Sequence, residues 1–106
     1  MDMNQYQEAA CETAIFPKDK SLMYLTLGIC GEAGEIAEKV KKHIRDNTSH
    51  HQLRESLILE IGDVMWYLAN LADAIHVDMD WIAIQNIEKI KSRMNRNKIQ
   101  GNGDNR

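Results

Sequence analysis

The sequence predicts an all-α protein: a four-helix, bundle-like domain over residues 1–95, followed by a disordered polar tail over residues 96–106. Apolar side chains recur every three or four residues along most of the chain, as helices with one buried face require. Strand-like alternation of Val, Ile and Thr is absent, and Pro17 is the only proline. With 106 residues, 43% of them hydrophobic, the chain can form one core but is too short for two domains.

The first two expected helices are separated by this proline. A helix over residues 4–14 ends before "FPKD", because a proline disfavours the helical conformation at the residue that precedes it. A long helix then covers residues 21–45. Its apolar side chains form a single stripe, made of Leu22, Leu25, Ile29, Ala33, Ile36, Val40 and Ile44.

The break "DNTSHH" separates the second helix from the third. Thr48 or Ser49 can cap the third helix, which runs to about residue 75. Its apolar stripe consists of Leu53, Leu57, Ile61, Val64, Leu68, Leu71 and Ile75. Asp78 is the expected cap of a fourth helix that runs toward Met94. The tail beyond it, "RNKIQGNGDNR", is polar and rich in Gly and Asn, so we expect it to be disordered.

Charge and composition exclude several classes of partner. Thirteen basic residues against 16 acidic ones give a net charge of -3, so no basic surface for nucleic acid is expected. The N-terminal segment has no apolar leader, and no run approaches the roughly 18 apolar residues of a membrane span. Cys11 and Cys30 form no C-x-x-C pair and fit free thiols in a reducing compartment. We therefore expect a cytoplasmic protein that binds no membrane.

Two pairs of carboxylates occupy matching positions on the two central helices. At about 100° per residue, Glu32 and Glu35 lie about 40° and 100° to one side of the apolar stripe. Glu60 and Asp63 lie at about the same offsets, on the same side of the stripe of the third helix. Antiparallel packing through the stripes would gather these four anions at one edge. Because crowded, partly desolvated anions repel one another, a cation is expected to bind there.

These four carboxylates are the candidate catalytic and metal-binding residues. Oxygen-only ligands favour Mg²⁺, with Mn²⁺ as a possible substitute, whereas zinc usually recruits His or Cys. Di-iron bundles carry two Glu-x-x-His motifs, and here only Asp73 and His76 have an acid-x-x-His spacing. The alternative is a solvated helix face, of the kind that Glu38 and Lys42 form.

Other residues on the same edges fit a phosphate ligand. Gly28 and Gly31 lead to the first carboxylate pair, where a helical glycine costs about 1 kcal/mol relative to alanine. Close approach of a ligand or of another helix would explain that cost. Lys39, Tyr67 and Asn70 continue the two carboxylate edges. An ammonium, a hydroxyl and an amide are suitable donors to phosphate oxygens, so these three are candidate substrate-binding residues.

The combined motifs resemble those of the MazG-like nucleoside triphosphate pyrophosphohydrolases, within the all-α NTP pyrophosphatase superfamily. The E-x-x-E of residues 32–35 and the E-x-x-D of residues 60–63 match the signature of that family, and "LGICGEAGEIAEKVKK" and "LEIGDVMWYLANLA" around them are also similar. "NIEKIKSRM" is similar to its N-x-x-K-x-x-x-R pattern through Asn86, Lys89 and Arg93. The likeness covers residues 4–94. Many relatives follow the arginine with an aromatic residue and a proline, which this chain lacks.

The resemblance implies a MazG fold and the hydrolysis of a nucleoside or deoxynucleoside triphosphate to the monophosphate and pyrophosphate, with Mg²⁺ held by the four carboxylates. All four stay candidates for the general base. The resemblance also implies that Asn86, Lys89 and Arg93 bind the polyphosphate together with Lys39. From the spacing alone, Lys89 and Arg93 are also consistent with an ordinary basic last turn.

The family further implies a homo-oligomer, for which we expect a tetramer in preference to a dimer, and a role in clearing unwanted nucleotides. Two alternatives stay open. Phosphoribosyl-ATP pyrophosphohydrolases are related all-α enzymes with similar carboxylates, so the substrate could differ while the metal chemistry stays the same. A non-catalytic helical module that binds a basic partner through its acidic edge is the alternative from another class.

Overall fold

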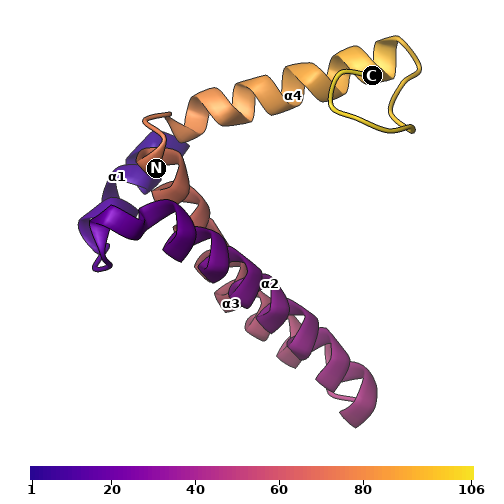
Figure 1. Cartoon of the computed structure of the whole chain (residues 1–106). Helices are drawn as coiled ribbons and strands as arrows, with labels where there is room; N and C mark the ends of the chain where they lie inside the picture. Colours follow the sequence, from indigo (N-terminus) through magenta and orange to yellow (C-terminus); the bar gives the residue numbers. More distant parts are fainter.

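The computed structural model describes all residues 1–106 and contains four α-helices and no strand (Figure 1). They are α1 (Met3–Glu12), α2 (Ser21–Asp46), α3 (His50–Ala74) and α4 (Met79–Asn95), with a short 3₁₀ helix, η1 (Lys18–Lys20), before α2. The all-α prediction is confirmed, and the helix ends lie within about two residues of those expected, which is the usual uncertainty of helix boundaries. None of the helices combines the length and the apolar character needed to cross a bilayer.

Local capping signals set the ends of the central helices. Of the two expected cap residues, Ser49 caps α3, and its hydroxyl accepts a hydrogen bond from the backbone of Gln52. The Gln52 side chain accepts in return from the backbone of Ser49, which completes a capping box. α2 ends at Asp46 and is followed by Asn47, whose φ of 50° is a left-handed conformation that asparagine tolerates. This short connection makes α2 and α3 an antiparallel hairpin that lies along one diagonal of Figure 1.

The small core lies where α1 crosses α3. Ala10, Ala69, Ala72 and Met79 are buried together, and Tyr6 and Trp66 pack against them. Three alanines leave room for the helix backbones to approach closely, so α1 is held against α3 with few large side chains. The Trp66 indole also donates a hydrogen bond of 2.7 Å to the hydroxyl of Thr13.

α1 also caps the start of α4. Asp78 occupies the N-cap position, as expected, but its side chain makes no capping hydrogen bond. The buried Gln7 amide instead accepts from the backbone nitrogen of Met79 at 3.0 Å, and Asn4 accepts from that of Asp80 at 2.9 Å. These two backbone N–H groups of the first turn have no partner within α4, and side chains of α1 accept their hydrogen bonds instead. The beginning of α4 is therefore fixed to α1.

Beyond its first turns, α4 extends away from the other helices, so the four helices do not close into a compact bundle within one chain (Figure 1). The radius of gyration is 16.6 Å, compared with about 13 Å for a compact domain of this length. Large apolar side chains of α4 are accordingly exposed, with Trp81 at 57%, Ile84 at 49% and Ile87 at 49%. The apolar face of α4 thus has no partner within the chain.

The tail after Asn95 contains turns and bends but no helix or strand. It folds back beside the end of α4, where Asn97 adopts a left-handed conformation with a φ of 58°. The domain boundary at residue 95 and the disorder of the tail stay predictions.

Candidate metal centre

The hairpin brings together three of the four carboxylates that the sequence singled out. Oxygen atoms of Glu32 on α2 and of Glu60 and Asp63 on α3 all lie within 4.8 Å of one another. Glu32 and Glu60 are half-buried and Asp63 is exposed, so the three open toward the surface. Glu35, one turn along α2, is exposed and lies outside this group.

The charges of the site disfavour ionisation of Glu32. Burial raises the pKa of Glu32, and the neighbouring carboxylates of Asp63, Glu60 and Glu35 raise it further. The Glu35 charge therefore acts on the group, although its oxygens lie farther out. A set of oxygen donors that repel one another, with no histidine or cysteine among them, fits a hard divalent cation.

In metal-free protein, we expect Glu32→Gln to raise the melting temperature at neutral pH. The raised pKa means that the folded state binds the Glu32 proton more tightly than the unfolded chain does. This stabilisation is present below the unfolded glutamate pKa of about 4.3 and is lost as the pH rises through the raised value. In EDTA, the melting temperature should therefore fall more steeply between about pH 5 and about pH 8 for the wild type than for the variant. The same pH dependence of the melting temperature in both proteins would show that folding does not raise the pKa of Glu32.

Aromatic side chains pack at the contact between α2 and α3 beside the site. The Tyr67 ring lies against Gly28, where a Cβ atom would overlap it. Trp66 contacts the Tyr67 ring edge-on, with centroids 5.0 Å apart, and Tyr24 lies 6.5 Å from it on the α2 side. Burial, the hydroxyl of Tyr24 and the charge of Glu32 raise the pKa of Tyr67, which therefore stays protonated and able to donate.

We expect Gly28→Ala to destabilise the fold by about 1 to 3 kcal/mol, because the new methyl group must displace the Tyr67 ring. The gain in helix propensity, about 1 kcal/mol, offsets only part of this cost. Gly31→Ala is the matched control, since a Cβ there meets nothing within 4 Å. Urea unfolding of both variants measures the difference. Equal stabilities would mean that Gly28 is not required for the contact between α2 and α3.

Lys39 and Asn70, the other substrate-binding candidates on the hairpin, have different surroundings. The Lys39 ammonium lies 3.9 Å from a carboxylate oxygen of Glu60, one member of the three-carboxylate group. Its side chain is 36% exposed, so this ion pair is screened and leaves the ammonium accessible. Asn70 is only 3% exposed, and its amide nitrogen donates to the carbonyl of Trp66 in the same helix. Its predicted contact with substrate stays a prediction.

The candidates on α4 do not lie beside the carboxylates of the same chain. Asn86, Lys89 and Arg93 are carried along the extended helix, away from the hairpin (Figure 1). Lys89 and Arg93 instead each lie 3.4 Å from a carboxylate oxygen of Asp104 in the tail. The structure therefore separates the expected phosphate-binding cations from the three-carboxylate group within one chain.

Two tyrosines near the site are absent from the sequence-based candidates. Tyr24 lies four residues before Gly28 and eight before Glu32, so its helical spacing already placed it on the carboxylate edge. Tyr6 comes from α1, and its pKa is raised by burial and by the charge of Asp63. Nothing in the local sequence indicates this proximity, because it arises from the packing of α1 on α3.

The family model of the MazG nucleotide pyrophosphohydrolase domain matches residues 20–97, a segment that contains all of the predicted site residues. The chain is also similar to Gene 37 protein of Mycobacterium phage L5, with 45% identity over 114 aligned positions that cover the whole of both chains. No solved structure matches the chain.

Proposed function

The chain belongs to the MazG nucleotide pyrophosphohydrolase family, and on that basis we propose that it hydrolyses nucleoside or deoxynucleoside triphosphates to the monophosphate and pyrophosphate. We propose that the reaction depends on Mg²⁺, for which Mn²⁺ can substitute. The observation that carries this proposal is the group formed by Glu32, Glu60 and Asp63, whose oxygens lie within 4.8 Å of one another.

These three carboxylates would hold the metal, with Glu35 beside them. When bound, Mg²⁺ supplies positive charge that neutralises phosphate oxygens and lowers the pKa of a bound water. We propose that the Lys39 ammonium, which lies 3.9 Å from a Glu60 oxygen, binds a further phosphate oxygen. The protonated Tyr67 hydroxyl offers a neutral donor on the α2 side.

A carboxylate that is not fully engaged by metal can take the proton of the attacking water. We assign this role to Glu35, because it is exposed and lies outside the three-carboxylate group. The water oxygen forms a bond to the α-phosphorus, and the bond from that phosphorus to the bridging oxygen breaks. The leaving pyrophosphate keeps the electron pair. Removal of unwanted triphosphates from the nucleotide pool is the role we propose for this reaction.

We further propose that a second copy of the chain completes the site. α4 carries Asn86, Lys89 and Arg93 away from the carboxylates of its own chain, so these donors would reach the metal centre of another copy (Figure 1). Exposed apolar side chains on both elements support self-association, among them Leu27 at 66% and Leu59 at 70% on the hairpin. We propose a homo-oligomer, with a tetramer preferred to a dimer.

A substrate panel tests the proposed activity. The purified chain is incubated with each standard ribonucleoside and deoxynucleoside triphosphate, and with phosphoribosyl-ATP, with Mg²⁺ and in EDTA. We expect pyrophosphate release from triphosphates only when Mg²⁺ is present. Preference for phosphoribosyl-ATP would assign the chain to that related reaction. If no substrate releases pyrophosphate at any Mg²⁺ concentration, the proposal is contradicted and a non-catalytic helical module is favoured.

A further inference from the structure

One acidic residue of the tail bridges the two cations of α4. The Arg93 guanidinium donates to the backbone carbonyl of Asp104 at 2.6 Å and to its carboxylate at 3.4 Å. The Lys89 ammonium donates to the same carboxylate oxygen, also at 3.4 Å. These two cations lower the pKa of Asp104, so the carboxylate is ionised at neutral pH. Asp104 thus occupies the donors to which we assign the phosphates of the substrate.

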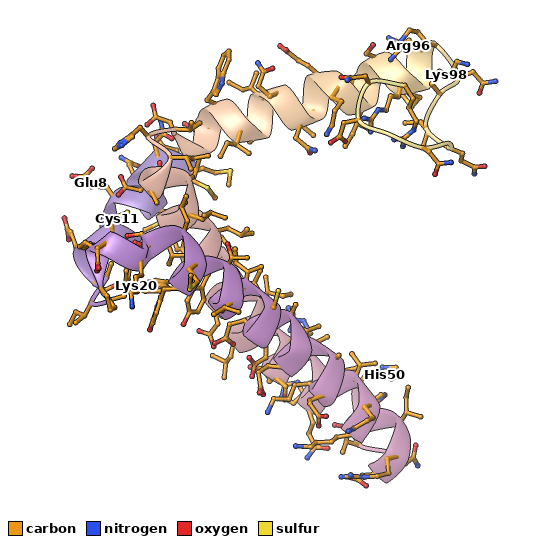
Figure 2. All side chains as sticks on the ribbon, viewed as in Figure 1. Glu8, Cys11, Lys20, His50, Arg96 and Lys98 are labelled. Carbon is orange, nitrogen blue, oxygen red and sulfur yellow. The ribbon has the colours of Figure 1, made fainter.

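Hydrogen bonds within the tail hold Asp104 in this place. The Arg106 guanidinium donates to the backbone carbonyls of Lys98 at 3.2 Å, Ile99 at 2.6 Å and Gly103 at 2.6 Å. Arg96, at the end of α4, donates in turn to the carbonyl of Arg106 at 2.8 Å. Figure 2 shows Arg96 and Lys98 at the far end of α4, where the tail turns back along the helix. In this structure these contacts close the tail into a loop and tie it to the end of α4.

The contact leaves Arg93 only partly satisfied. Arg93 is 7% exposed, and its buried Nε atom has no hydrogen-bond partner. The Asp104 side chain is 85% exposed, so water screens both of its ion pairs. A phosphate group has more acceptor oxygens and more charge than one carboxylate, and it can satisfy donors that Asp104 leaves free. A polyphosphate should therefore displace the tail.

We propose that residues 96–106 form an autoinhibitory latch, in which Asp104 occupies Lys89 and Arg93 in place of a substrate phosphate. The latch rests on the proposed function, because it assumes that these two cations bind phosphate. The tail and the substrate compete for the same donors, so the latch lowers the apparent affinity for substrate and leaves the chemical step unchanged. Since exposed ion pairs are weak, we expect the effect to be about two- to fivefold.

Asp104→Asn in the full chain tests the latch, with inorganic pyrophosphate as the probe. We expect the variant to bind pyrophosphate in EDTA about two- to fivefold more tightly than the wild type. Its KM for a triphosphate should fall by a similar factor, with kcat unchanged. Glu88→Gln is the matched control, because it removes the same charge from exposed surface on α4 and forms no ion pair with Lys89 or Arg93. The control should leave both quantities at wild-type values.

The outcomes separate the latch from the activity on which it rests. If Asp104→Asn leaves pyrophosphate binding unchanged, or if Glu88→Gln changes it equally, the latch is wrong while wild-type pyrophosphate release still stands. If the wild type neither binds pyrophosphate nor releases it from any triphosphate, the proposed function is wrong and the latch falls with it. A second readout is the backbone amide NMR signal of Asp104, which should move to its unbound position as pyrophosphate is added.

Discussion

Glu60→Gln should abolish Mg²⁺-dependent pyrophosphate release, with a loss of about a thousandfold or more in kcat. Glu60 is one of the three carboxylates whose oxygens lie within 4.8 Å of one another, and its amide replacement keeps the shape while removing a charge. Bound metal contributes several kcal/mol of charge stabilisation, and about 1.4 kcal/mol corresponds to each factor of ten in rate. Steady-state pyrophosphate assays over a range of Mg²⁺ concentrations measure this loss.

Glu38→Gln is the matched control for this variant. Glu38 lies on α2 one turn beyond Glu35, and it pairs with Lys41 at 2.7 Å on the surface. Its replacement removes an equal charge from the same hairpin and should leave kcat within about twofold, since surface ion pairs contribute little. Glu35→Gln should lose activity as Glu60→Gln does, because we assign proton transfer to Glu35. Near-wild-type activity of Glu60→Gln at saturating Mg²⁺ would contradict the proposed metal centre. Near-wild-type activity of Glu35→Gln would contradict the assignment of Glu35 as the base.

Lys89→Ala should lower kcat/KM by roughly 10- to 150-fold. A charge-assisted contact with the triphosphate is worth about 1.5 to 3 kcal/mol, which corresponds to that range of rates. The affinity of the nucleotide-free protein for Mg²⁺ should barely change, because no metal ligand is altered. If Lys89 is only a solvated charge near the end of α4, kcat/KM should stay within about twofold of the wild type.

Mixing two impaired variants, with kcat/KM as the readout, tests whether Lys89 acts on another copy of the chain. Glu60→Gln has intact cations and Lys89→Ala has intact carboxylates, so a mixed oligomer can assemble a complete site from the two. With pairwise exchange of subunits, roughly a quarter of all sites should be complete, and activity should recover to that fraction of the wild type. Failure to recover after verified subunit exchange would show that each chain supplies its own cations.

The helices and the carboxylate edge could be predicted from the sequence because their signals are local. Apolar spacing and the capping box at Ser49 set the bounds of the central helices. Both carboxylate pairs lie on the same side of the apolar stripe of their helix, and this position predicts that they converge when the stripes pack together. The structure gathers Glu32, Glu60 and Asp63 and leaves Glu35 outside this group.

The position of α4 could not be predicted in the same way. Its direction is fixed by Gln7 and Asn4 of α1, which cap its first turn from far away in the sequence. An apolar stripe shows that a helix face needs a partner, but it does not show whether that partner is in the same chain. The proximity of Tyr6 to Asp63 likewise depends on long-range packing and leaves no periodic signal.

Hydrolysis in water labelled with heavy oxygen tests the proposed chemistry most directly. Each triphosphate that releases pyrophosphate is turned over by the wild type with Mg²⁺, and the label is located in the products by mass spectrometry. Attack at the α-phosphorus places the label in the nucleoside monophosphate and none in pyrophosphate, with no turnover by Glu60→Gln. Label in pyrophosphate, orthophosphate as the first product, or undiminished turnover in EDTA would contradict metal-dependent attack at the α-phosphorus by this site.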